Sequence, residues 1–280
     1  LLITYYLKTS RTNIALYEVQ NMLKEAQKED DKTGLSRCYN IMSQIYTIKR
    51  FDSMAFEWRL KEIELTEKYN IENYNISQTY AQIANYYISQ KKQKEALRAV
   101  EKAISTANSS TQQISAKLEY VNYYSKFGDF QAAEKILKEC QIAFEQDKRL
   151  ESIKKRLYNI ECLYYQQTRQ YQKALEAAEM QEKEEHRLSE SILSSSHYRT
   201  QGEIYQKMGN MNMAVKYLQM YINTDDSLKI ANEQVASSEF ATLLNVEKLN
   251  AEKKELMLQA QEKELHNKTT LIISLIILLG

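Results

Sequence analysis

The segment YAQIANYYISQKKQKEA, residues 80–96, places two apolar patterns on either side of a short polar stretch. In its first half, apolar residues follow one another at steps of three and four, the spacing of one face of an α-helix: Tyr80, Ile83, Ala84 and Tyr87. Ala96 lies nine residues after Tyr87 and opens the second pattern. The segment predicts two antiparallel helices joined by a tight turn, with Ala96 where only a methyl group lets two backbones come close.

A Tyr followed nine residues later by an Ala recurs six times, at intervals of 37 to 41 residues. The pairs are Tyr6 with Ala15, Tyr46 with Ala55, Tyr87 with Ala96, Tyr124 with Ala133, Tyr165 with Ala174, and Tyr205 with Ala214. Self-similarity at such a period indicates a repeat architecture, in which each unit buries its apolar face only against its neighbours.

The composition predicts an all-helical chain. Its 280 residues contain no Pro and only five Gly, so little interrupts a helix, whereas β-architectures usually contain many turn residues. Two of the glycines stand in short turns, Gly128 before Asp129 and Gly209 before Asn210. Gly there supplies a left-handed end to one helix, and Asp or Asn caps the next.

A small residue stands three positions before the repeated Tyr in four units, and a larger one in a fifth: Ser43, Ala84, Cys162 and Gly202, then Val121. With the Gly-Asp turn and the following Ala, this pattern resembles the tetratricopeptide repeat over roughly residues 1–222. The usual Trp and the Pro that closes each repeat are missing, and the period is longer than that family's. The resemblance implies an α-solenoid of about six helical hairpins over residues 1–224, with longer second helices.

In tetratricopeptide arrays the first helices line a concave groove. Here the positions that would face it are mostly polar: Asn40, Gln44, Asn85, Asn122, Asn159, Arg199 and Glu203, with Ala81, Leu118 and Leu163 at the equivalent places of other units. Asn and Gln both donate to and accept from a peptide backbone, and Arg156 and Arg199 could contact a carboxylate. The resemblance implies a peptide or protein ligand. The family's carboxylate-grasping set of two Asn with flanking Lys is only partly present, so a C-terminal carboxylate is not implied.

The composition changes at residues 225–268, which are densely charged and contain neither Gly nor Pro. Asp225, Asp226 and Ser227 have the composition of a capped helix start. We expect one long helix that caps the array and continues as a juxtamembrane segment. Apolar residues recur along it at steps of seven, in two rows: Leu244, Ala251, Leu258 and Leu265, and separately Leu249 and Leu256. Rows about 140° apart form no single seam, so they predict at most a weak coiled coil, through which two copies would dimerise.

Residues 269–280 are almost entirely apolar. Twelve helical residues would span about 18 Å, short of the ~30 Å hydrocarbon core of a bilayer. Because the run follows a highly charged helix, we expect the start of a transmembrane helix that is cut partway through. The alternative is an apolar contact with the solenoid or with another chain. We also expect the amino terminus to be cut, since Tyr6 falls where a first helix should be well under way, and no signal peptide is visible.

This order of parts resembles the sensor region of bacterial membrane-anchored histidine kinases and helix-turn-helix regulators. In those proteins a tetratricopeptide array precedes a Glu/Lys-rich helix and one membrane span, and residues 246–256 are similar in style to that helix. The resemblance implies a single-pass protein of the bacterial inner membrane with its array in the periplasm.

No catalytic, cofactor or metal site is expected. His186, His197 and His266 form no close ligand pair, and five dispersed glycines form no phosphate loop. The cysteines, Cys38, Cys140 and Cys162, are scattered singly and are read as small core residues. A formal charge of +1 without a basic block gives no electrostatic footprint for nucleic acid.

The leading hypothesis is an interaction and sensing module, not an enzyme. It binds a peptide or protein and relays its ligand state through the long helix to an absent output domain. Two alternatives remain: a scaffold or adaptor without signalling output, and a soluble peptide-responsive regulator in which the terminal apolar run is buried.

Overall fold

The computed structural model describes residues 2–9, 11–188 and 195–279, with the backbone alone for residues 8, 185–188 and 267–279. The helices are α1 (Leu2–Lys8), α2 (Thr12–Lys28), α3 (Lys32–Ile48), α4 (Asp52–Tyr69), α5 (Ile76–Ser89), α6 (Gln93–Ser105), α7 (Ser110–Phe127), α8 (Phe130–Gln146), the 3-10 helix η1 (Lys148–Ile153), α9 (Lys154–Gln167), α10 (Tyr171–Leu188), α11 (Ser196–Lys207) and α12 (Met211–Leu279). These ranges contain no strand, and the all-helical prediction is confirmed.

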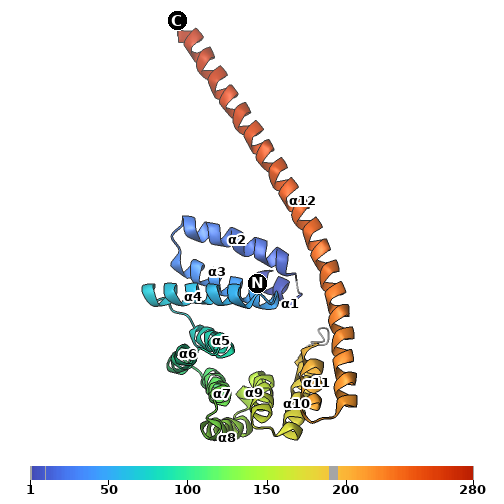
Figure 1. Ribbon diagram of the computed structural model, residues 1–280. Helices are drawn as coiled ribbons and strands as arrows, with labels where there is room; N and C mark the ends of the chain where they lie inside the picture. The colour runs from blue at the N-terminus through green and yellow to red at the C-terminus, as the bar shows by residue number, and fades with distance from the viewer. Residues whose placement is uncertain (1, 10, 189–194, 280) are drawn as a thin grey trace. The chain divides into compact units, whose positions relative to one another are not determined.

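The chain forms two compact units. One consists of the residues up to Ala15 with those from Ala231 onward, and the other runs from Leu16 to Ile230. In the second unit the helices follow one another as antiparallel pairs, α3 with α4 through α9 with α10 (Figure 1). First helices of successive pairs also lie side by side, α5 against α7 and α7 against α9. The predicted helical-hairpin solenoid is confirmed; the predicted domain boundaries at 224 and 268 stay a prediction.

The repeated Tyr and Ala define the same turn in every hairpin. The Tyr carbonyl accepts from the backbone N–H five residues later at 2.8 to 3.0 Å, and the Ala N–H donates back to that residue's carbonyl at 2.9 to 3.1 Å. Each of the six Ala residues is at most 2% exposed. These positions are therefore buried, as expected for a methyl group between two helices, and the predicted close approach of the two backbones stays a prediction.

The residue four places after the Tyr has a left-handed backbone wherever the structure describes it. Two of these residues are the predicted glycines, Gly128 (φ 91°) and Gly209 (φ 78°), whose followers Asp129 and Asn210 cap the next helix as predicted. The other three are not glycine: Arg50, Lys91 and Arg169, with φ between 57° and 61°. These hairpins therefore close with the same geometry but with backbone strain.

The small residues three places before the Tyr are buried between helices. Gly202 allows the closest approach, because a Cβ there would lie 2.8 Å from Leu218 Cγ. The cysteines are free and buried, as predicted. Burial raises the pKa of the Cys140 thiol to about 12 and also raises that of Cys162, so neither presents a thiolate at neutral pH.

The predicted helix start at Asp225–Ser227 is wrong. α12 is one uninterrupted helix of 69 residues that begins at Met211, because no Gly or Pro breaks it. The side chains that suggested a cap have other partners. Asp225 accepts a hydrogen bond from Ser195 at 3.0 Å, and the Ser227 hydroxyl donates to the Asn223 carbonyl one turn back at 2.9 Å.

In the other unit, a carboxylate of α12 contacts the start of α2. The Glu239 carboxylate of α12 accepts from the backbone N–H groups of Asn13 and Ile14, at 3.1 and 3.3 Å, and from Asn13 Nδ2 at 2.7 Å. These N–H groups belong to the first turn of α2, where a helix offers no carbonyl four residues earlier to accept from them. Glu239 therefore caps α2 from a position 226 residues further along the chain.

The predicted localisation is wrong. Within the part of the chain that the structure describes, no helix carries an apolar stretch long enough to cross a membrane. α12 stays helical to Leu279. The side chains of residues 269–280, read from sequence as the start of a transmembrane helix, lie outside the described ones. The inner-membrane, single-pass placement with a periplasmic array is therefore withdrawn.

Candidate functional site

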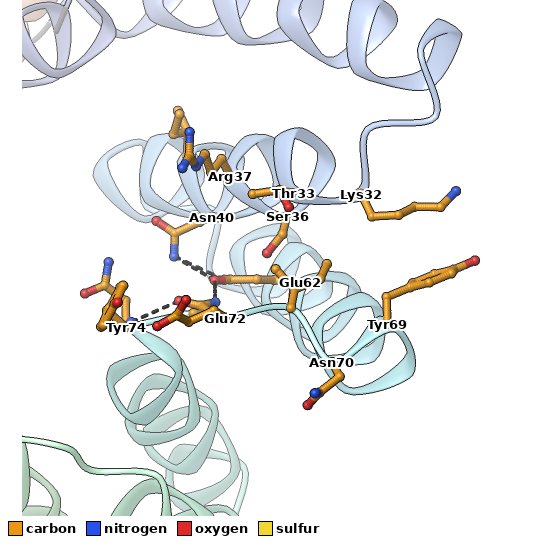
Figure 2. Close-up of a pocket in the computed structure, with 14 residues that line it drawn as sticks. Lys32, Thr33, Ser36, Arg37, Asn40, Glu62, Tyr69, Asn70, Glu72 and Tyr74 are labelled. Atoms are coloured by element: carbon orange, nitrogen blue, oxygen red, sulfur yellow. Dashed lines mark hydrogen bonds between the residues drawn. The ribbon is translucent and has the colours of Figure 1, made fainter.

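A cavity of about 850 Å³ lies between α3, α4 and the loop of residues 70–75 that leads to α5. We call it the Glu62 cavity, because its wall includes this buried carboxylate (Figure 2). The other lining side chains are mostly polar, among them Asn40 of α3 and Glu72 and Asn73 of the loop. A site this size admits a side chain or a short peptide segment.

Glu62 is 1% exposed, and its hydrogen-bond donors among the described residues are all neutral. Asn40 Nδ2 donates to both carboxylate oxygens at 3.1 Å, Asn73 Nδ2 donates to one at 2.9 Å, and the Thr79 hydroxyl lies 3.4 Å from the other. Burial raises the pKa of Glu62 above its ordinary value; the bonds from Asn73, Asn40 and Thr79 oppose that rise, and so does the nearby charge of Arg59. The cost of burying this charge is only partly offset.

Arg59 lies one turn before Glu62 on α4 but is directed to other partners. Its Nε donates to Gln82 at 2.7 Å and its terminal nitrogen to the Thr47 hydroxyl at 2.6 Å. Among the described residues, no lysine or arginine forms an ion pair with Glu62. Burial lowers the pKa of Arg59, and the nearby Glu62 charge counteracts this.

A second cavity, of about 360 Å³, lies between α3 and α5 and is lined by side chains that are all polar: Asn40, Gln44, Asn75, Gln78, Thr79 and Gln82. Gln44 Nε2 donates to Asn40 Oδ1 at 2.6 Å. Asn40 and Asn75 also line the Glu62 cavity, so the two are contiguous. We call this second space the amide cavity. Its five carboxamides offer both donors and acceptors, as a peptide backbone requires.

A third cavity, of about 210 Å³, continues along the first helices of the next hairpins. It is lined from α5, α7 and α9, and includes Asn85, Asn122 and Leu163. Asn122 Nδ2 donates to Asn85 Oδ1 at 2.7 Å, which joins α7 to α5. First helices of four successive hairpins thus contribute to the row of cavities.

Comparison with known proteins finds likeness in structure alone, since no family model and no curated protein matches the chain. RapI in its apo form superposes with a TM-score of 0.62 at 16% identity, over 81% of each chain. NprR in complex with its cognate peptide NprX gives a TM-score of 0.62 at 13% identity, over 79% of this chain and 64% of NprR. A tetratricopeptide repeat protein from Parabacteroides merdae gives 0.56 at 15% identity, over 85% of this chain and 82% of that one.

The chain has the tetratricopeptide-repeat fold. This outcome confirms the resemblance read from the repeated Tyr, Ala and small residues. At these identities the likeness extends to the fold alone, so ligand and output must be argued from this chain's own side chains.

Of the residues predicted to line the tetratricopeptide groove, the structure brings two pairs together at cavities: Asn40 with Gln44, and Asn85 with Asn122. Leu163 lies beside the second pair. Ala81 and Leu118, at 2% and 0% exposure, are core residues, so their assignment to the groove is wrong. They stand at positions where α5 and α7 pack against neighbouring helices.

The other predicted residues line none of these cavities. Arg199 donates to Glu203 one turn along α11 at 2.8 Å, and Asn159 is exposed on α9. Arg156 forms an ion pair with the buried carboxylate of Glu119 on α7. Whether any of the predicted residues binds a ligand stays a prediction.

Sequence reasoning missed the residues that complete the amide cavity. Gln78 and Gln82 precede the predicted Asn85 by seven and three residues, so one helical row on α5 carries all three. That row could have been predicted from the sequence. No sequence pattern indicated Glu62, because it lies on a second helix and its partners Asn40 and Asn73 come from other elements.

Proposed function

We propose that the array binds an extended peptide, or an extended segment of a protein, along its first helices. The observation that carries this proposal is the amide cavity, where Asn40, Gln44, Asn75, Gln78 and Gln82 face one space between α3 and α5. A carboxamide can donate to a backbone carbonyl and accept from the next backbone N–H, so a row of them fits any sequence in extended conformation. The proposed role is binding and not catalysis.

The structural neighbour NprR was solved in complex with its cognate peptide NprX. Its fold therefore accommodates a peptide, which supports the proposal by analogy. The third cavity, at Asn85 and Asn122, would extend the contact along two further hairpins. We take the amide cavity as the central subsite and the third cavity as its continuation.

A binding assay tests the proposal directly. Fluorescein-labelled hexapeptide libraries are titrated with the protein, and binding is read as fluorescence polarisation. The double variant Gln44→Ala with Gln78→Ala should weaken binding about tenfold or more, the loss expected from two hydrogen bonds of about 1 kcal/mol each. Gln93→Ala, on the exposed start of α6, is the matched control and should bind like wild type. Equal binding by all three proteins would remove the amide cavity from the proposal.

We further propose that α12 relays the ligand state to a partner or output domain. The first turns of α12 pack against α11 as the second helix of the last hairpin, and the same helix continues without a break to Leu279. A continuous helix transmits a displacement at one end along its length. A scaffold without signalling output would have no need for such a coupling.

Spin labels at Lys94→Cys and Lys254→Cys measure that coupling. The native cysteines are buried, and burial raises the pKa of each thiol, so the introduced pair should take the label selectively. Relay predicts that the distance distribution from double electron–electron resonance changes when a selected peptide is added. An unchanged distribution at saturating peptide favours the scaffold.

A further inference from the structure

The Glu62 cavity contains a buried negative charge that the described residues do not neutralise by an ion pair. Asn40, Asn73 and Thr79 supply its hydrogen bonds, and all three are uncharged. A buried carboxylate without a cation is costly, because neutral donors replace only part of the solvation that water gave it. Such a charge on a cavity wall attracts a cation from outside the chain.

The basic side chains at the rim are directed elsewhere. In Figure 2 both Lys32 and Arg37 extend from α3 away from Glu62. Lys32 forms an ion pair with Asp30, and its ammonium lies 5.1 Å from the centre of the Tyr69 ring. Arg37 is exposed.

Other features of the rim suit a cationic side chain. The loop contributes a second carboxylate, Glu72, and two tyrosines line the cavity, Tyr69 and Tyr74. Aromatic rings pack against the aliphatic stems of lysine and arginine and attract their charge. The volume of about 850 Å³ accommodates either side chain together with backbone on both sides of it.

We propose that the Glu62 cavity is the subsite for a cationic group of the ligand, the ammonium or guanidinium of a basic peptide residue. This inference rests on the proposed function and adds a specificity to it. The contiguous amide cavity binds backbone regardless of sequence, and Glu62 selects a basic residue at one position. Asn40 lines both cavities and donates to Glu62, so it connects the two subsites.

Paired libraries that differ only in charge test the selection. One hexapeptide library fixes Arg at a single position and its partner fixes citrulline, which is nearly isosteric and uncharged; a second pair fixes Lys and norleucine. Wild type should prefer the charged member of each pair by about tenfold or more, the gain expected from one charge-assisted hydrogen bond. In Glu62→Gln the preference should fall to within about twofold. Glu64→Gln, exposed on the same helix, is the matched control and should keep it.

A conservative variant tests whether a lost preference reflects the lost charge or a disturbed fold. Glu62→Asp keeps the charge, so it should retain a preference for Arg over citrulline, and circular dichroism spectra of both variants should match wild type. A wild-type protein that binds the charged and neutral libraries equally would overturn the cation subsite and leave the proposed peptide binding intact.

Titration with agmatine, a free guanidinium compound, separates the two proposals. If no library binds but agmatine binds wild type and not Glu62→Gln, the cation subsite stands and the peptide function fails. If neither the libraries nor agmatine binds wild type, both proposals fail.

Discussion

Two buried glutamates in the repeat array, Glu62 and Glu119, show how one fold treats the same charge differently. Each is 1% exposed, and each accepts from an Asn on a first helix. Glu119 of α7 has a counter-ion within the chain, the guanidinium of Arg156 from α9. Glu62 of α4 has neutral donors and a cavity beside it.

The difference shows how a carboxylate that stabilises the fold of a repeat protein can be distinguished from one that is available to a ligand. The ion pair at Glu119 connects two neighbouring first helices, so it has a sufficient explanation within the fold. At Glu62 the same burial comes without an ion pair among the described residues, and the adjacent cavity leaves room for a cation from outside the chain. A repeat array can therefore hold a structural carboxylate and a binding carboxylate two hairpins apart.

The largest effect should come from breaking the Glu119 ion pair. Arg156→Ala leaves the carboxylate buried without its counter-ion, and we expect the free energy of unfolding to fall by about 3 kcal/mol. Urea denaturation followed by circular dichroism measures the change. In the double variant Arg156→Ala with Glu119→Gln, no orphan charge remains, so much of the loss should be recovered. A loss below about 1 kcal/mol in the single variant would mean that the ion pair is not a structural requirement.

A smaller effect is expected at Glu62. Glu62→Gln removes a charge that forms no ion pair among the described residues, so unfolding at neutral pH should change by about 1 kcal/mol or less. If this variant instead lost as much stability as Arg156→Ala, the two glutamates would play the same structural part and the comparison would fail.

The pH dependence of that effect has a definite sign. Burial raises the pKa of Glu62 above 4.5, so the folded chain holds this proton more tightly than the unfolded chain. The contribution of Glu62 to stability is then full below pH 4.5 and is lost as the pH rises through its folded-state pKa. Glu62→Gln cannot ionise at this position, so it does not lose this stability as the pH rises. Relative to wild type, it should therefore gain stability between pH 4 and pH 7, measured as the difference in urea midpoints at each pH; a constant difference contradicts a raised pKa.

The repeated Tyr and Ala made the hairpins predictable, because a methyl-sized contact and a helix face are local properties of sequence. The groove was less predictable, since Ala81 and Leu118 occupy the same register as Asn40 but are buried. Register alone does not say how far each helix rotates toward its neighbour. Glu62 could not be inferred at all, because its setting depends on contacts with residues 11 to 22 positions away on other elements.

Local composition also gave a wrong helix start in the tail and did not indicate the turns that lack glycine. Asp225 and Ser227 looked like a cap, yet they lie inside a helix where Ser195 and the Asn223 carbonyl bind them instead. A cap needs a break in the helix to act on, and no residue in α12 provides one. Conversely, Arg50 and Lys91 take the left-handed conformation that Gly128 takes, although neither residue type signals it. There the tertiary contact of the hairpin overrides the backbone preference.

The smallest effect tests whether these turns contribute to the contrast between the two regions. Hairpin α5–α6, beside the Glu62 cavity, turns through Lys91 at φ 57°, and hairpin α7–α8, which contains Glu119, turns through Gly128 at φ 91°. Lys91→Gly removes the left-handed strain and should stabilise by about 0.5 to 1 kcal/mol, while Gly128→Ala introduces it and should destabilise by about 1 kcal/mol. Apart from the adjoining backbone, no atom lies within 4 Å of a Cβ built at Gly128, so the cost of Ala there is conformational and not steric. Urea midpoints give both values. If each exchange shifts stability by this amount and leaves the Arg-over-citrulline preference unchanged, the two regions differ through their glutamates and not through their turns. A changed preference in Lys91→Gly would instead mean that the turn helps to shape the cavity.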